Sequence, residues 1–137
     1  MQHRDLLQDQ IDQLGRTLGK LVAYLFQLRQ TGDLLPGLDQ AKHETKDRTG
    51  IELDELLGQP PEALAAYAEA HGLTAGHLDH LAQYLAELAP LAQVGQRMGY
   101  YTTALSLLEL ADDRSEAYSL SREATKRRIL ASSQRMA

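Results

Sequence analysis

Apolar residues in the first part of the chain recur in alternating steps of four and three, and this pattern constrains the fold more than any other feature. The residues that carry it are Leu7, Ile11, Leu14, Leu18, Leu21, Leu25 and Leu28. Such a spacing places one apolar side chain per turn on a single helix face. It predicts a long first helix over residues 4–31, which Gly32 ends because glycine readily takes the left-handed conformation.

A flanking row on the same helix consists of Gly15, Gly19, Val22 and Phe26. This row makes the apolar face wider than the seam of a two-stranded coiled coil, which favours burial in a globular bundle. Each glycine inside a helix costs about 1 kcal/mol relative to alanine. We therefore expect Gly15 and Gly19, four residues apart, to mark the closest contact with the backbone of another helix.

The composition of the whole chain also favours helices over strands. The sequence holds 26 Leu and 18 Ala but only 2 Val and 3 Ile, whereas strands are enriched in β-branched and aromatic residues. We expect an all-α fold of antiparallel helical hairpins that forms a single domain over residues 1–137.

Prolines and glycines divide the rest of the chain into shorter elements. The expected elements are a turn at 34–37, a polar helix at 37–48, a short amphipathic turn at 51–57 and a helix at 60–72. Thr74 is a suitable N-cap for the next helix. Pro90 removes one backbone hydrogen bond and clashes with the carbonyl of Ala86, so that helix should bend or break there. Gly99 should end it, and another helix should start near Tyr100.

The last helix is expected to span residues 114–133. Asp113 and Glu116 are spaced as in a capping box. The apolar stripe expected on this helix is thin and consists of Ala117, Leu120, Ala124 and Ala131. Because such a stripe buries little area, we expect the helix to be the least stable element and its tail, residues 132–137, to fray.

Residues 85–118 resemble one tetratricopeptide repeat, a helix–turn–helix unit of 34 residues with large and small side chains at set places. Leu91-Ala92 matches the Leu-Gly pair of the repeat, Gly99 its turn glycine and Tyr101 its aromatic position. Ala104, Leu108 and Ala111 fall where its second helix has Ala, an aromatic and Ala. Gly95, Leu88 and Glu116 depart from the pattern, where the repeat usually has an aromatic, Trp and Pro.

The chain as a whole is similar to a bacterial family of uncharacterised helical proteins with tetratricopeptide-like packing, over about residues 3–125. The segments that carry the resemblance are QIDQLGR at 10–16, ELDELL at 52–57, Leu73-Thr74 and the repeat-like stretch. The resemblance implies a helix stack with a long N-terminal helix. It implies no activity, because the family has none assigned.

Charge and composition narrow the class of function. With no cysteine, the chain has no disulfide, thiolate metal site or cysteine nucleophile. No apolar run reaches the roughly 18 residues of a membrane span, and the N-terminus lacks a signal-peptide pattern, so we expect a cytoplasmic protein. Residues 50–113 are strongly acidic and 114–137 basic. An acidic surface disfavours nucleic acid, and the basic tail either binds an acidic partner or folds back on the acidic segment.

His71, His77 and His80 cluster in the sequence and could bind a metal ion. His77 and His80 are three residues apart and share a helix face, which suits a zinc site. The alternative is that the three are ordinary polar residues at the end of one helix and the start of the next, and we favour it. No nucleotide-binding motif or catalytic triad stands out, so neither a cofactor nor an enzymatic activity is expected.

The favoured function is a small protein-interaction module. Stacks of helical hairpins expose a groove along one face. By the repeat resemblance, the residues on this groove are Ala86, Ala89, Gln93, Gln96 and Arg97. Arg97 is the lone basic residue of the acidic segment and could hold a partner's carboxylate. The alternatives are a homodimer built on the first helix, whose stripe is long enough for a second copy, and a metal-binding protein or enzyme that uses residues 71–80.

Overall fold

The computed structural model describes residues 2–32, 37–115 and 119–136, with side chains from residue 8 to residue 135 within these ranges. The elements are α1 (Gln2–Thr31), α2 (Leu38–Thr49), η1 (Leu53–Glu55), α3 (Pro61–Ala70), α4 (Ala75–Leu88), η2 (Ala89–Leu91), α5 (Val94–Arg114) and α6 (Leu120–Met136). No strand occurs in these ranges, which confirms the all-α class. The expected turn at 34–37 lies outside the described residues except for Gly37.

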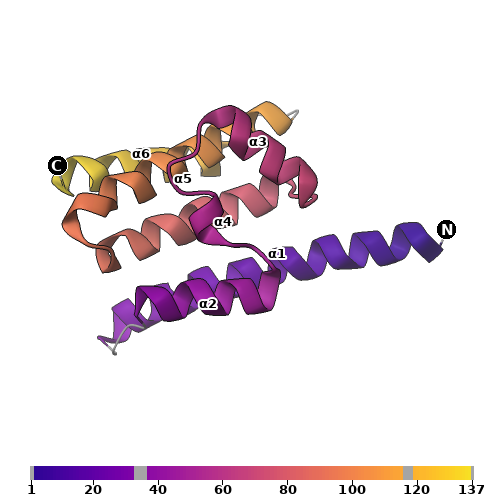
Figure 1. The fold of residues 1–137 in the computed structure, drawn as a ribbon, viewed down its shortest axis with the longest axis horizontal. Coiled ribbons are helices and arrows are strands. Elements are labelled where there is room, and N and C mark those ends of the chain that lie inside the picture. Colours follow the sequence, from indigo (N-terminus) through magenta and orange to yellow (C-terminus); the bar gives the residue numbers. More distant parts are fainter. Residues whose placement is uncertain (1, 33–36, 116–118, 137) are drawn as a thin grey trace.

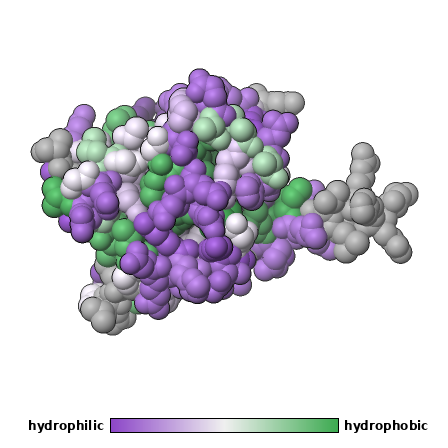
Figure 2. All heavy atoms as spheres, in the orientation of Figure 1, coloured by the Kyte–Doolittle hydropathy of each residue, from purple (hydrophilic) through white to green (hydrophobic). Residues whose placement is uncertain are grey.

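The helices α1, α4, α5 and α6 stack side by side in that order, and each packs against the next (Figure 1). α2 returns along α1, and α3 covers part of α5. The N-terminal end of α1 projects beyond the other helices (Figure 1). Hydrophilic side chains cover much of the face shown in Figure 2, with apolar ones visible between them. No described helix is long and apolar enough to cross a membrane.

The apolar stripe of α1 is confirmed over the part of the helix that packs on α4. Leu18, Leu21 and Leu25 are almost completely buried. Ile11, Leu14 and Leu28 are half-buried, and the side chain of Leu7 lies outside the described residues. The flanking row does not extend as far as expected, because Phe26 is 53% exposed. Val22 is partly buried against the core, so the covered part of this row ends before Phe26.

Several helix boundaries follow from local chemistry that the sequence already indicates. Thr74 caps α4: its hydroxyl accepts a hydrogen bond from the His77 amide, and His77 Nδ1 accepts one from the Thr74 amide. α2 ends at Gly50, whose φ of 76° is left-handed. Pro90 breaks the helix as expected, since α4 stops at Leu88 and the chain turns through η2 into α5.

The prediction that a helix ends at Gly99 is wrong. α5 runs unbroken from Val94 to Arg114, with Gly95 and Gly99 inside it. The chain has already reversed direction at residues 89–93, so the hairpin is formed by α4 and α5, and residues 85–118 are not a helix pair with a turn at Gly99. The continuous buried face of α5, which includes Tyr100, Ala104 and Leu107, outweighs the roughly 1 kcal/mol that Gly99 costs inside the helix.

The last helix also differs from its prediction. α6 begins at Leu120, and the cap is Ser119, whose Oγ accepts a hydrogen bond of 3.1 Å from the Arg122 amide. Asp113 belongs to α5, and Glu116 lies outside the described residues. Helix persists to Met136 instead of fraying from residue 132.

The buried face of α6 is not the alanine stripe. Leu120 is 77% exposed, Ala124 and Ala131 are exposed, and Ala117 lies outside the described residues. The residues that face the bundle are Arg122, Thr125, Ile129 and Ser133. Ile129 supplies apolar contact, and Arg122 is buried because it binds two carboxylates on neighbouring helices. A search for apolar periodicity could not predict that a charged residue faces the bundle.

Candidate functional site

Two features that stand apart in the sequence, the glycine pair of α1 and the histidines of α4, meet in the fold. A Cβ atom built on Gly15 would lie 3.7 Å from the His77 ring, and one built on Gly19 would lie 3.4 Å from the His80 ring. The groups that contact these glycines therefore belong to the same chain, as expected for part of the apolar face of α1. They are two imidazole side chains, however, and not the backbone of another helix.

His77 has a structural role at this junction. Its Nδ1 accepts the Thr74 amide hydrogen at 3.0 Å, so its Nε2 carries the proton that it donates to the carbonyl oxygen of Ile11 at 2.8 Å. Both ring nitrogens are used, and the ring is buried. The ring thus caps α4 and joins that helix to α1.

The other two histidines lie in different surroundings. His71 stacks on the Tyr67 ring, with centroids 3.9 Å apart. Burial lowers the pKa of His80, although the charge of Asp79 opposes the shift, and its Nδ1 is buried without a hydrogen-bond partner. Among the described residues no group of three or more His, Cys, Asp or Glu side chains could hold a metal ion. The structure does not gather the cluster into a ligand set.

The five residues expected to line a partner groove do not share one surface. Ala89 is completely buried, and Ala86 faces a small cleft beside α6. Gln93 is the exposed residue that precedes α5, and Gln96 lines a different cleft, beside α2. Arg97 turns back onto the chain reversal, where it donates to the carbonyl oxygens of Ala92 at 3.0 Å and Pro90 at 3.3 Å.

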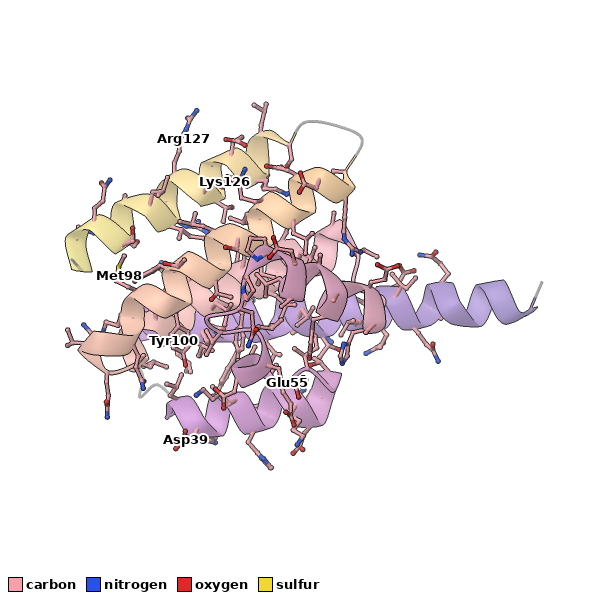
Figure 3. All side chains as sticks on the ribbon, turned by 45° about the horizontal axis from the view of Figure 1, so that its top comes forward. Asp39, Glu55, Met98, Tyr100, Lys126 and Arg127 are labelled. Carbon is pink, nitrogen blue, oxygen red and sulfur yellow. The ribbon has the colours of Figure 1, made fainter. Side chains whose placement is uncertain are left out.

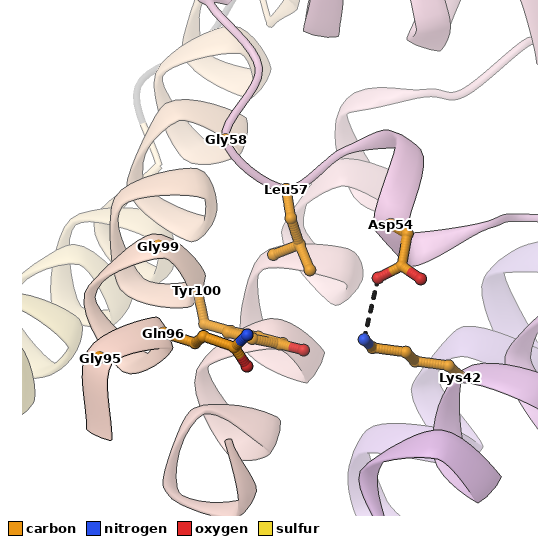
Figure 4. Close-up of a pocket in the computed structure, with 8 residues that line it drawn as sticks. All are labelled: Lys42, Asp54, Leu57, Gly58, Gly95, Gln96, Gly99 and Tyr100. Atoms are coloured by element: carbon orange, nitrogen blue, oxygen red, sulfur yellow. Dashed lines mark ion pairs between the residues drawn. The ribbon is translucent and has the colours of Figure 1, made fainter. Parts of the chain in front are cut away.

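The cleft beside Gln96 is a candidate site. It measures about 310 Å³ and lies between α2, the segment at residues 51–58 and the first turns of α5 (Figure 4). Its lining residues are Lys42, Asp54, Leu57, Gly58, Gly95, Gln96, Gly99 and Tyr100. We call it the glycine-lined cleft, because Gly95 and Gly99 add no side chains to the wall that α5 forms, where only Gln96 and Tyr100 project. Gly58 holds the opposite wall in place, since its amide donates to Thr103 Oγ1 of α5 at 3.1 Å.

An ion pair forms the wall of the glycine-lined cleft that faces α5 (Figure 4). Lys42 Nζ is 2.9 Å from Asp54 Oδ1 (Figure 4). Burial by itself lowers the pKa of Lys42, but the hydrogen bond to Asp54 and the nearby Tyr100 outweigh it, so the pKa is raised. Burial raises the pKa of Tyr100, although Lys42 opposes this. At neutral pH Lys42 is therefore a cation and Tyr100 a neutral phenol.

The glycines occupy a helix face that no other part of the described chain covers. Nothing lies within 4 Å of a Cβ built on Gly95 or on Gly99. Met98 and Tyr100 point to opposite sides of α5 (Figure 3), and by helical periodicity the two glycines lie between them. Met98 is 43% exposed. The open face thus has an apolar side chain on one side and the glycine-lined cleft on the other.

The basic tail folds back on the acidic segment, which is one of the two outcomes expected from the charge pattern. Arg122 of α6 binds Asp79 through two hydrogen bonds, 2.7 Å to Oδ1 and 3.0 Å to Oδ2. It also donates to Asp112 Oδ1 at 3.0 Å. Lys126 bonds the same Asp112, and this hydrogen bond chiefly lowers the pKa of Asp112, against a smaller opposite effect of burial.

Comparison of the chain with protein-family models, with curated proteins and with solved structures found no match in any of the three. The all-helical architecture implied by the family resemblance is present. The family itself and the tetratricopeptide-like packing stay predictions.

The main residues that sequence analysis missed are Gly95 and its neighbours around the cleft. A signal for them was present: Gly95 and Gly99 repeat the four-residue spacing of Gly15 and Gly19. The repeat resemblance assigned Gly99 to a turn and treated Gly95 as an exception at a position that is usually aromatic. The two glycines were therefore not recognised as part of one helix face. Lys42 and Asp54 carried no comparable signal, because their pairing depends on how η1 packs near α2.

Proposed function

We propose that the protein is a small, non-enzymatic interaction module that binds a helical segment of a partner protein across the glycine face of α5. The observation that carries the proposal is the pair Gly95 and Gly99, which leaves empty space on a helix next to a cleft. Gly99, in the interior of α5, costs roughly 1 kcal/mol relative to alanine, and no group of the described chain lies within 4 Å of the position that a Cβ atom would take there.

The glycine pair of α1 supports this interpretation. Gly15 and Gly19 have the same spacing, and there the space is filled by His77 and His80 of α4. Small residues four apart allow a second helix to approach closely. By the same logic, the open pair on α5 has room for a helix that belongs to another molecule.

The surroundings of the glycine face suggest the chemistry of that helix. Leu57 and Tyr100 on one side and the exposed Met98 on the other are apolar or partly apolar. Methionine adapts its shape at binding surfaces, and amphipathic helices commonly bind such grooves through residues spaced three and four apart. The Lys42–Asp54 ion pair on the opposite wall is available to polar groups at the edge of the helix.

The proposal can be tested by affinity capture from the native host with matched baits. Gly99→Leu fills the glycine face, and Ala66→Leu places the same side chain at an exposed position on α3. We expect the wild type and Ala66→Leu to recover a common partner that Gly99→Leu loses while its circular dichroism stays native. Equal recovery by all three folded baits would refute a role for the glycine face, and so would the absence of any partner specific to the wild type.

A homodimer through α1 is the second candidate, and one observation favours it. The N-terminal end of α1 projects beyond the bundle (Figure 1), and Tyr24 and Phe26 are about half-exposed farther along the helix. Sedimentation equilibrium at micromolar concentration measures the oligomeric state directly. A monomer in that experiment would rule out this candidate and leave the proposed interaction module unaffected.

A further inference from the structure

A second cleft, of about 240 Å³, is lined by residues near the ends of α1, α4 and α6. These three helices end on the same side of the bundle (Figure 1). We call this second cleft the arginine cleft. Its charged lining residues are Arg29, Glu87, Arg128 and Arg135, contributed by three helices. The chain as a whole has a net charge of −5, so the excess of positive charge in this cleft is opposite in sign to the net charge of the molecule.

Only one of the three arginines is neutralised within the cleft. Arg29 Nη1 lies 2.7 Å from Glu87 Oε2, and its Nη2 donates to the Glu87 carbonyl oxygen. Arg135 donates to Ser132 Oγ at 3.1 Å, which leaves its charge uncompensated. Arg128 is exposed and forms no ion pair within the described ranges. Two guanidinium groups on α6 are therefore available to an anion.

The helix dipoles explain the positions of two of these arginines but not of the third. Arg29 and Arg135 lie in the last turns of their helices, where a cation is stabilised by the negative end of the dipole. Arg128 lies about two turns before the end of α6, beyond the range of that effect. Helix ends of this polarity present carbonyls, so hydrogen-bond donors for an anion must come from side chains, as the guanidinium groups do here.

We propose that the arginine cleft binds a carboxylate group of an acidic peptide, held by Arg128 and Arg135. A guanidinium group matches a planar carboxylate with two parallel hydrogen bonds, as Arg122 does with Asp79 elsewhere in this fold. Ala86 and Pro90 on the walls of the cleft provide apolar contact for the methylene groups that carry the carboxylate. The volume suits one acidic side chain and its neighbour.

This inference does not depend on the proposed function at the glycine-lined cleft. The two clefts share no lining residue. Tyr100 lines the first and Tyr101 the second, because successive residues of α5 point in different directions. Loss of binding at one cleft should leave the other intact.

The test is an NMR titration of the full ¹⁵N-labelled chain at constant ionic strength with four probes. The probes are a short acetylated Glu-Glu peptide, its Gln-Gln counterpart, glutarate and inorganic phosphate. We expect the Glu-Glu peptide to shift amide signals of residues 128–135 saturably and the Gln-Gln peptide to leave them unchanged. The variant Arg128→Gln/Arg135→Gln should weaken this binding about tenfold or more, since a charge-assisted hydrogen bond contributes roughly 1.5–3 kcal/mol.

Arg127→Gln is the matched control. Arg127 is exposed and points away from the bundle (Figure 3), so this variant removes one positive charge from the same helix without touching the cleft, and it should bind as the wild type does. Binding of glutarate but not of the peptide, or of phosphate alone, would overturn the assignment to an acidic peptide. Equal weakening by Arg127→Gln, or no localised shift with any probe, would overturn the cleft as an anion site.

Discussion

Replacing Arg122 by methionine should destabilise the protein by about 3 kcal/mol. The Arg122 side chain is 5% exposed and makes three hydrogen bonds to two carboxylates. Removing one partner of a buried ion pair typically costs 3–5 kcal/mol, because the other charge stays behind unpaired. Here Asp79 and Asp112 are 27% and 35% exposed, so water recovers part of that loss and the low end of the range applies.

Chemical denaturation followed by circular dichroism measures this effect. At roughly 4 °C per kcal/mol for a chain of this size, the midpoint of thermal unfolding should fall by about 10 °C. Arg127→Met is the control on the same helix, and surface changes of this kind usually stay within about 0.5 kcal/mol. A loss below about 1 kcal/mol for Arg122→Met would refute the argument that this ion cluster anchors α6.

A double-mutant cycle tests whether the loss comes from the ion pair itself. Asp79→Asn combined with Arg122→Met should destabilise by clearly less than the sum of the two single changes, because both remove the same interaction. Coupling between directly bonded residues is commonly about 0.5–3 kcal/mol. Additive effects would mean that Arg122 acts through packing of its aliphatic stem and not through Asp79.

Three further predictions concern single residues. Gly15→Leu should lower the free energy of unfolding by more than 1 kcal/mol in urea, since the larger side chain displaces His77 and overpacking commonly costs about 1–3 kcal/mol; a stabilised variant would contradict this. Gly99→Ala should raise the thermal midpoint, with a gain of about 1 kcal/mol, because its surroundings are open; a lower midpoint would show that this face is occupied. Burial places the pKa of His80 in the folded protein below its ordinary 6.5, so the unfolded chain binds the proton more readily. The contribution of His80 to stability should therefore be complete above pH 6.5 and be lost as the pH drops through the folded pKa. His80→Gln should lack this loss, and identical pH dependence in both proteins would contradict the assignment.

The sequence by itself determined the class of fold and the elements whose signals are local. The leucine stripe of α1, the cap at Thr74 and the break at Pro90 each depend on residues within a few positions of one another. Short-range interactions alone produce these features: a periodic apolar face, a hydroxyl that accepts a hydrogen bond from a free amide, and a proline ring that cannot continue a helix. Such features need no knowledge of the rest of the chain.

The tertiary structure decided which glycine ends a helix and which face of a helix is buried. Gly99 has the local properties of a helix end, yet α5 passes through it because the buried face on either side is continuous. On α6 the bundle selects Arg122 and Ile129 over the alanine stripe. The reason is that Asp79 and Asp112, which neutralise Arg122, are 43 and 10 residues away along the chain.

The candidate sites, too, depend partly on the sequence and partly on the tertiary structure. The sequence contains both glycine pairs and all the arginines of α6, but it does not show which side chains cover them. Packing fills the space beside Gly15 and Gly19 with two histidine rings and leaves Gly95 and Gly99 open. It buries Arg122 against acidic partners and leaves Arg128 and Arg135 at a cleft. Identical residue types thus become structural or available for binding according to long-range contacts, because burial and charge pairing depend on neighbours that only the folded chain brings together.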